Sequence, residues 1–168
     1  MTTVDNAPVL ICYDRSDDAR RAIETAAALF PGRKAIVMHV WSPVAVVAAA
    51  YGGMVALPAY DDQELQQAAL KISDEGVALA IEAGLEASPE SVECTYQGTW
   101  HAIIDVADEY EAAVIVLGAR GLSTFKSFVL GSVSHGVAQH SHRPVLVVPP
   151  AVRSDRAAAP AEHATATS

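Results

Sequence analysis

The sequence predicts an α/β protein with a doubly wound, five-stranded parallel sheet in the order 3-2-1-4-5 and helices on both faces. Short apolar runs alternate along the chain with segments in which apolar residues recur every three or four positions. The first pattern is typical of strands buried on both faces, and the second of amphipathic helices. Strands that alternate with helices pair in parallel through right-handed crossovers. A length of 168 residues is enough for one domain with a core.

Five segments have the composition of strands. The first (PVLICY, residues 8–13) and the second (KAIVMHVW, residues 34–41) are mainly apolar, and the third (SVECTY, residues 91–96) alternates apolar and polar residues. The fourth (AAVIVL, residues 112–117) and the fifth (PVLVV, residues 144–148) are again apolar. We expect the first and fourth strands to be central neighbours, since a doubly wound sheet changes direction there.

Four helices are expected between these strands. A polar turn at residues 14–18 has the chemistry of a helix N-cap, and Pro31-Gly32 stops the helix that follows. The second and longest helix opens at Asp61-Asp62 and ends near Gly84. The remaining helices are expected at residues 100–110 and 133–142, the last with Ser132 as its N-cap.

Two segments show neither the pattern of a strand nor that of an amphipathic helix. Residues 42–59 are predicted to form a loop, of a length that is often used for lids or binding segments. Residues 150–168 are rich in Ala, Pro, Ser and Thr and are predicted to form a disordered tail, so that the predicted domain covers residues 1–149. No targeting signal is evident at the start, and no apolar stretch reaches the roughly 20 residues that span a bilayer. We therefore expect a cytoplasmic protein with no membrane contact.

The charge and the cysteines narrow the classes of function. The formal net charge is −9, and the 11 Lys and Arg residues are scattered, which argues against binding to nucleic acid. Cys12 and Cys94 fall within predicted strands and are read as small buried thiols. No spacing of Cys and His residues indicates a metal site. A phosphate ligand would therefore be bound locally, mostly by the backbone.

The clearest functional signal is a glycine-rich loop between the fourth strand and the last helix. GARG at residues 118–121 is followed by nine residues and then by Gly131-Ser132. Glycines allow close backbone approach and positive φ, and the first N–H groups of a helix have no internal partner. Together with the helix dipole, this arrangement favours a phosphate. The spacing matches neither GxxxxGK[ST] nor GxGxxG after the first strand.

The pattern G-x2-G-x9-G-S resembles the nucleotide signature of the universal stress protein family, in its ATP-binding branch. The opening VLICYDRSDDARRAI (residues 9–23) and the closing GSVSHGVAQHSHRPVLVV (residues 131–148) are also similar to that family. The resemblance covers roughly residues 8–149. It implies a regulatory module of the stress response that binds ATP, or a related adenine nucleotide, with Mg²⁺. It also implies a homodimer formed through an edge strand from Pro144 to Val148.

The resemblance further implies roles for individual residues. Asp14 would reach the ribose, and the backbone near Val40 would hold the adenine. The residues that it places around the nucleotide are Asp14, Val40, Leu117, Gly118, Arg120, Gly121, Gly131, Ser132, Val133 and Ser134. The family commonly has Gly directly after the Asp of the first turn, where this chain has Arg15.

Simpler readings and other functions remain open from the sequence. Asp14 could serve only the turn, Gly118 and Gly121 could form a plain connector, and Arg120 could be solvated. The alternatives to a regulatory nucleotide-binding module are a slow ATPase and a dimeric interaction module that needs no nucleotide. No dedicated general base is evident near the loop, so we assign no catalytic residue.

Overall fold

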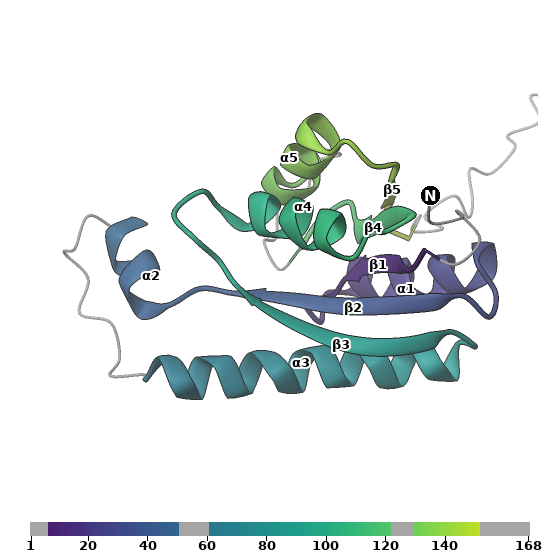
Figure 1. The fold of residues 1–168 in the computed structure, drawn as a ribbon, viewed down its shortest axis with the longest axis horizontal. Helices are drawn as coiled ribbons and strands as arrows, with labels where there is room; N and C mark the ends of the chain where they lie inside the picture. Colours follow the sequence, from purple (N-terminus) through teal and green to yellow (C-terminus); the bar gives the residue numbers. More distant parts are fainter. Residues whose placement is uncertain (1–6, 51–60, 122–129, 152–168) are drawn as a thin grey trace, which may run out of the picture.

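The fold is built on one parallel sheet in the order β3-β2-β1-β4-β5, which confirms the predicted topology (Figure 1). The computed structural model describes residues 7–50, 61–121 and 130–151. The elements are β1 (Val9–Cys12), α1 (Asp17–Leu29), β2 (Lys34–Trp41), α2 (Val44–Ala50), α3 (Asp62–Glu82), β3 (Glu86–Glu93), α4 (Thr99–Glu109), β4 (Val114–Gly118), α5 (Ser132–His140) and β5 (Val145–Val148).

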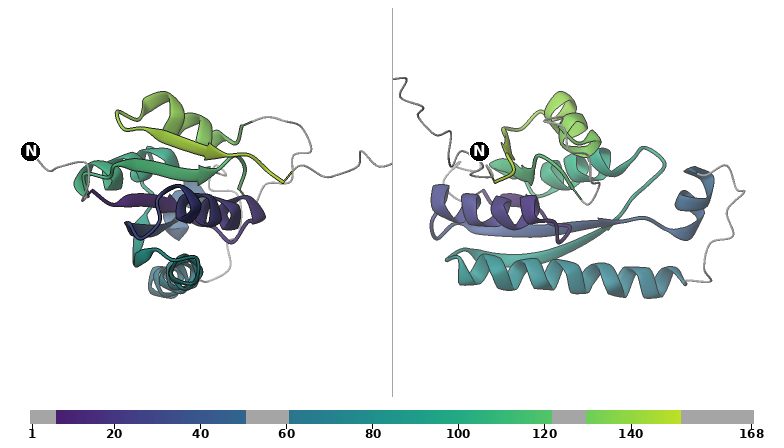
Figure 2. Two further views of the ribbon diagram at one scale, coloured as in Figure 1. Left: turned by 90° about the vertical axis from the view of Figure 1, so that its right-hand side faces the viewer. Right: turned by 180° about the vertical axis from the view of Figure 1, so that it is seen from behind.

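Helices cover the sheet on both faces, as predicted. α1 and α3 pack on one face, and α4 and α5 on the other (Figures 1 and 2). Successive residues of the central strand β1 point to opposite faces of the sheet. Ile11 packs in one core with Ile23 of α1, and Leu10 packs in the other core with Ile103 of α4. All four side chains are buried. The two cores fix the carboxyl ends of β1 and β4 beside each other, where the direction of the sheet changes.

The third strand is not where the sequence predicted it. It runs Glu86–Glu93 and pairs with β2 along the whole length of both strands, whereas the alternating pattern had pointed to residues 91–96. The physical reason is its position at the edge of the sheet, where polar side chains and Pro89 are tolerated because one side faces solvent. Cys94 consequently lies just beyond the strand, although it is buried as expected.

Part of the predicted loop at residues 42–59 is a helix. The segment Val44–Ala50 forms α2, whose first turn is held by hydrogen bonds from Val46 and Val47 to the Pro43 carbonyl. Its Val and Ala residues are all apolar, so they show no helical period, and the helix could not be recognised from periodicity. Residues 51–60 of the predicted loop lie outside the described part of the chain.

The last helix begins and ends earlier than predicted. α5 covers Ser132–His140 instead of residues 133–142, and its N-cap is Gly131, so the prediction of Ser132 as the cap was wrong. Of the tail predicted from residue 150 onward, residues 152–168 lie outside the described structure. Among the helices of the described ranges, none combines the length and the apolar character that crossing a bilayer demands.

Candidate functional site

A cavity of about 260 Å³ lies at the carboxyl ends of β1, β2 and β4, beside the first residues of α4 and α5. All the residues that the sequence singled out line this one cavity. They are Asp14, Val40, Leu117, Gly118, Arg120, Gly121, Gly131, Ser132, Val133 and Ser134. The chain therefore brings together four separate stretches of sequence at the point where strand order reverses, which is the usual place for a ligand in such a sheet.

Asp14 follows β1 and connects its own turn with the glycine loop. Its Oδ1 accepts a hydrogen bond of 3.0 Å from the backbone N–H of Ser16. Ser16, not Asp14, is the N-cap of α1, since its Oγ accepts from the backbone N–H of Ala19. A Cβ atom on Gly121 would lie 2.7 Å from Asp14 Oδ2. The carboxylate of Asp14 thus stabilises the turn and still borders the cavity.

Close packing, and not backbone conformation, accounts for the first two motif glycines, Gly118 and Gly121. Among the described glycines, positive φ occurs at positions 32, 84 and 98, outside the motif. The expectation that the loop glycines take positive φ is therefore not met at Gly118, Gly121 or Gly131. A Cβ atom on Gly118 would lie 2.7 Å from the Cβ of Asp18 and 2.8 Å from its carbonyl carbon. Glycine at 118 allows the end of β4 to contact the first turn of α1.

The amino end of α5 supplies backbone donors at the cavity. The N-cap Gly131 makes no side-chain capping bond, and its own N–H donates to the carbonyl of Ala119 at 2.8 Å. The first N–H groups of a helix lack intrahelical acceptors. Ser132 is exposed and Val133 half-buried, so their amides begin the helix at the border of the cavity. This is the donor arrangement that binds phosphate at helix ends.

Ser134 has a structural contact that the sequence did not reveal. Its side chain is buried, and its hydroxyl lies 2.9 Å from the Ala119 carbonyl and 3.0 Å from the Gly131 carbonyl, to either of which it donates. The side chain therefore connects the GARG segment (residues 118–121) with the start of α5. Its hydroxyl proton is therefore engaged within the protein, and any contribution of Ser134 to a ligand would come from the backbone or from the oxygen lone pairs.

Arg120 pairs with an acidic residue beneath the loop. Its Nε lies 3.5 Å from Oδ2 of Asp18, an atom that is buried without a hydrogen-bond partner among the described residues. The Asp18 side chain is 11% exposed and that of Arg120 is 29% exposed. A buried carboxylate needs a compensating cation. The positive charge of Arg120 is consequently shared between Asp18 and the cavity.

Several lining residues were not predicted. They are Cys12, Tyr13, Ala19, Met38, His39, Thr99 and Ile103. Four of them directly precede Asp14 or Val40 in the sequence, namely Cys12, Tyr13, Met38 and His39, and this proximity was the signal that could have identified them. Nothing in the sequence indicated that residues of α4 line the cavity. Burial, and secondly the negative charge of Asp14, raise the pKa of the Cys12 thiol to about 12. This thiol is therefore protonated at neutral pH and is not a nucleophile.

Within the described ranges, no group of three His, Cys, Asp or Glu side chains lies together in a way that could hold a metal ion.

Comparison with known proteins gives consistent matches. The sequence model of the Universal stress protein family matches residues 6–149. The chain is 33% identical over 146 residues to universal stress protein YxiE of Bacillus subtilis (strain 168), covering 83% of this chain and 97% of that one. A universal stress protein solved in complex with cAMP is 26% identical, with a TM-score of 0.59 and coverage of 86% of this chain and 97% of the other. The Archaeoglobus fulgidus protein in complex with dAMP is 23% identical, with a TM-score of 0.61 over 86% of this chain and 98% of the other.

Proposed function

Since the chain belongs to the universal stress protein family, we propose that it is a regulatory protein that binds an adenine nucleotide, ATP with Mg²⁺, with little or no hydrolysis. The observation that carries the proposal is that the three glycines and the serine of the G-x2-G-x9-G-S motif line one cavity together with Asp14 and Val40. Structural neighbours solved with cAMP and dAMP support the choice of an adenine nucleotide.

In this proposal the phosphates lie at the amino end of α5. The backbone N–H groups of Ser132 and Val133 and the exposed hydroxyl of Ser132 donate to phosphate oxygens. Arg120, whose backbone lies beside Gly131, also lines the cavity and adds positive charge. Gly118 and Gly121 leave room for Asp18 and Asp14 against the backbone of the loop, so that these segments stay close together at the cavity.

The nucleoside lies between the ends of β1 and β2. Asp14 Oδ2 faces the glycine loop, and the carboxylate can accept hydrogen bonds from the ribose hydroxyls. The backbone at Val40, at the end of β2, holds the base. Cys12, Met38 and Ile103 supply apolar surface around the base.

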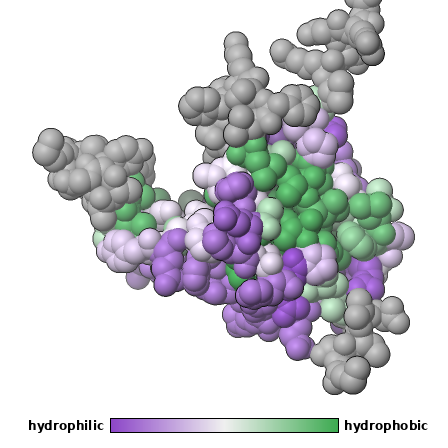
Figure 3. Space-filling view, turned by 90° about the horizontal axis from the view of Figure 1, so that it is seen from above, coloured by the Kyte–Doolittle hydropathy of each residue, from purple (hydrophilic) through white to green (hydrophobic). Residues whose placement is uncertain are grey.

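The proposed protein acts as a homodimer through β5. This strand lies at one edge of the sheet, and its first three residues, Val145 to Val147, are only half-buried. The surface above α5 and β5 has a broad apolar area (green in Figure 3). An unpaired apolar edge strand invites pairing with another chain. Sedimentation equilibrium at micromolar concentration should give the mass of a dimer, and a monomer would contradict this part of the proposal.

The nucleotide is tested first on the purified wild-type protein. Native mass spectrometry should detect an adenine nucleotide that purifies with the protein. ATP with Mg²⁺ at about a hundredfold excess over Kd should stabilise the folded state by about 2.7 kcal/mol, a rise in Tm of roughly 5–10 °C. The absence of both effects at millimolar ATP would refute the proposal. Steady release of ADP from the complex would show instead that the protein is an ATPase.

A matched pair of variants assigns the binding to the cavity. Asp14→Ala should weaken ATP binding, because it removes the acceptor for the sugar hydroxyls. Asp17→Ala changes the net charge equally, but Asp17 is exposed in the first turn of α1 and does not line the cavity. Equal losses in the two variants would show that only the overall charge matters.

A further inference from the structure

One carboxylate outside the cavity holds both neighbours of Asp14. Glu75 of α3 accepts a hydrogen bond of 2.7 Å from the Tyr13 hydroxyl at Oε1 and another of 2.7 Å from Arg15 Nε at Oε2. An NH2 nitrogen of Arg20 donates to Oε1 at 2.9 Å. We call these four residues the Glu75 cluster. Its members Tyr13 and Arg15 precede and follow the aspartate that borders the cavity.

The backbone around Asp14 is held in an unusual conformation. Arg15 has φ of 68°, the left-handed region that costs a residue with a side chain roughly 1–2 kcal/mol. Both backbone polar groups of Tyr13 are bonded to β2. Its N–H donates to the Met38 carbonyl at 2.9 Å, and its carbonyl accepts from His39 Nδ1 at 2.8 Å. A strained conformation persists only where surrounding contacts determine it. The ion pair of Arg15 with Glu75 is one such contact.

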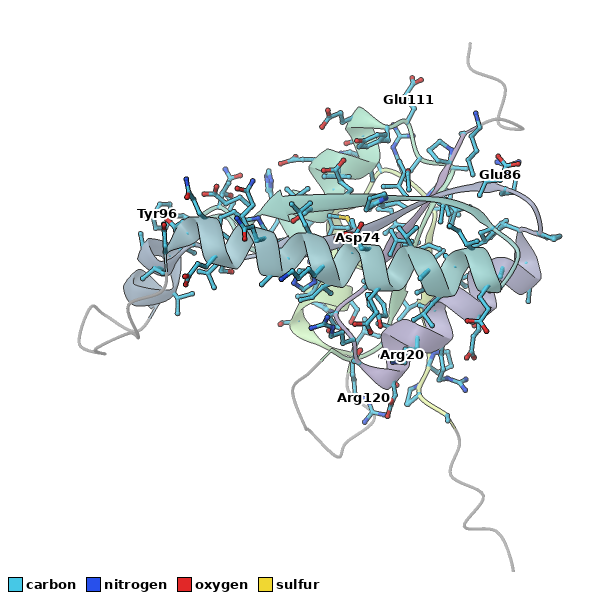
Figure 4. The ribbon with its side chains drawn as sticks, turned by 90° about the horizontal axis from the view of Figure 1, so that it is seen from below. Arg20, Asp74, Glu86, Tyr96, Glu111 and Arg120 are labelled. Atoms are coloured by element: carbon cyan, nitrogen blue, oxygen red, sulfur yellow. The ribbon has the colours of Figure 1, made fainter. Side chains whose placement is uncertain are left out.

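Helix α3 is placed so that Glu75 can reach this turn. A Cβ atom on Gly76 would lie 2.7 Å from Val37 Cγ1 and 2.8 Å from Tyr13 Cδ1. Glycine therefore lets α3 lie directly on the Tyr13 ring. The guanidinium of Arg20 lies 5.9 Å from the centre of the same ring, on α1 beside α3 (Figure 4).

The charges of the cluster agree with this geometry. The hydrogen bond from Tyr13, and then the two arginines, hold the pKa of Glu75 below its ordinary value. Burial, and then the bond to Glu75, raise the pKa of Tyr13 to about 12. At neutral pH the carboxylate is therefore ionised and the phenol protonated, which is the state in which all three donors can bind one acceptor group.

We propose that Glu75 is a positioning residue of the nucleotide site: through Tyr13 and Arg15 it fixes the turn that aims the Asp14 carboxylate at the sugar hydroxyls. This inference rests on the proposed binding of an adenine nucleotide. Glu75 does not line the cavity, so its effect on binding is transmitted through the turn. Loss of the cluster frees the turn, and the contact between Asp14 and the sugar weakens while the contacts with the phosphates stay.

The test compares two nucleotides that differ only in the sugar. Isothermal titration calorimetry measures Kd for ATP and for 2′,3′-dideoxy-ATP, which lacks both sugar hydroxyls, in the wild type, Glu75→Ala and Asp74→Ala. Glu75→Ala should lose about tenfold in affinity for ATP, as for one hydrogen bond to a charged group, with little change for the dideoxy analogue. Asp74 precedes Glu75 on α3 and is exposed (Figure 4), so Asp74→Ala should bind both as the wild type does.

Two further measurements separate positioning from general destabilisation. Amide hydrogen exchange of the Ser16 N–H, which donates to Asp14 Oδ1, should be faster in nucleotide-free Glu75→Ala than in Asp74→Ala. Glu75→Gln, which keeps an acceptor oxygen, should restore part of the preference for ATP. If Glu75→Ala does not fold, the preference is read from Glu75→Gln.

The outcomes distinguish the inference from the function on which it rests. If the wild type binds neither nucleotide, the proposed function fails and the inference fails with it. If the wild type prefers ATP and the Glu75 variants keep the same ratio of the two Kd values, the inference alone is overturned. An equal loss of affinity for both nucleotides also overturns it, because a merely structural effect does not discriminate between sugars.

Discussion

Replacing Gly118 by Ala tests the claim that the first motif glycine is required by the contact between β4 and α1. The new Cβ would lie 2.7, 2.8 and 3.0 Å from Cβ, the carbonyl carbon and the carbonyl oxygen of Asp18. Carbon atoms pack best at about 3.5–4.0 Å. Two of the three contacts are backbone atoms in the first turn of a helix, so they cannot be relieved by a side-chain rotation.

The expected cost follows from two opposing terms. Overpacking of this kind costs about 1–3 kcal/mol, and the removal of a glycine from a strand returns about 0.5–1 kcal/mol. Because two of the contacts are with backbone atoms, the upper half of the overpacking range applies, and the net loss in the free energy of unfolding should be about 1–2.5 kcal/mol, or a fall in Tm of roughly 2–10 °C.

Urea denaturation followed by far-UV circular dichroism measures this loss, at one protein concentration and without nucleotide, because both would shift the midpoint. The control is Gly131→Ser in the same loop. The nearest atom to a Cβ there is the Ala119 carbonyl oxygen at 3.3 Å, and serine is favoured at an N-cap, so the change should stay within about 0.5 kcal/mol. A Gly118→Ala variant as stable as the wild type would refute the packing argument.

Three further changes test other contacts. Gly136→Ala should destabilise the protein by about 1–2 kcal/mol in the same urea assay, because its Cβ would lie 2.6 Å from Trp100 Cγ and helix propensity offsets only about 1 kcal/mol; an unchanged midpoint would contradict the close packing of α4 and α5. Ser134→Ala should cost about 1 kcal/mol by removing the donor to the Ala119 carbonyl, and a neutral result would mean that water replaces it. The lowered pKa of Glu75 contributes stability that is present above the ordinary value of 4.5 and is lost as the pH falls through the folded-state pKa. The difference in unfolding free energy between the wild type and Glu75→Gln should therefore be larger at pH 7 than at pH 3.5, and a constant difference would contradict this linkage.

The sheet order and ten of the residues that line the cavity were predicted from the sequence, whereas seven lining residues, among them Thr99 and Ile103 of α4, were not. The apolar runs of the central strands are buried on both faces, and the motif places backbone groups by its spacing alone. The predicted bounds of β3 were wrong because this edge strand carries polar residues and Pro89. Helix α2 was not predicted because every residue of Val44–Ala50 is apolar, so the segment shows no helical period. Asp14 and Val40 were placed at the cavity by resemblance, and the strand ends bring them there.

The Glu75 cluster shows what sequence patterns do not contain. Glu75 and Arg15 are 60 positions apart, and each reads as a solvated charge when taken alone. Their contact depends on the close packing of α3 against Tyr13, which is possible because residue 76 is a glycine. The periodicity of apolar residues in a helix does not predict such a contact. The residue type gave no indication of the left-handed conformation of Arg15, and the available signal was the Gly that the family commonly has at this position.

In the proposed complex an acidic protein binds a polyphosphate, although Arg120 is the only Lys or Arg among the described residues that line the cavity. The formal net charge is −9, and the arginine at the cavity already compensates a buried carboxylate, Asp18. The backbone amides at the amino end of α5 therefore have to provide most of the attraction, and amides act only on a ligand that comes within hydrogen-bonding distance. That requirement accounts for two glycines of the motif: a side chain at Gly118 would meet Asp18 at the start of α1, and a side chain at Gly121 would meet the carboxylate of Asp14. In the proposed complex the motif therefore acts by keeping these backbone segments close together, and the backbone dipoles at the start of α5 compensate the charge of the phosphates.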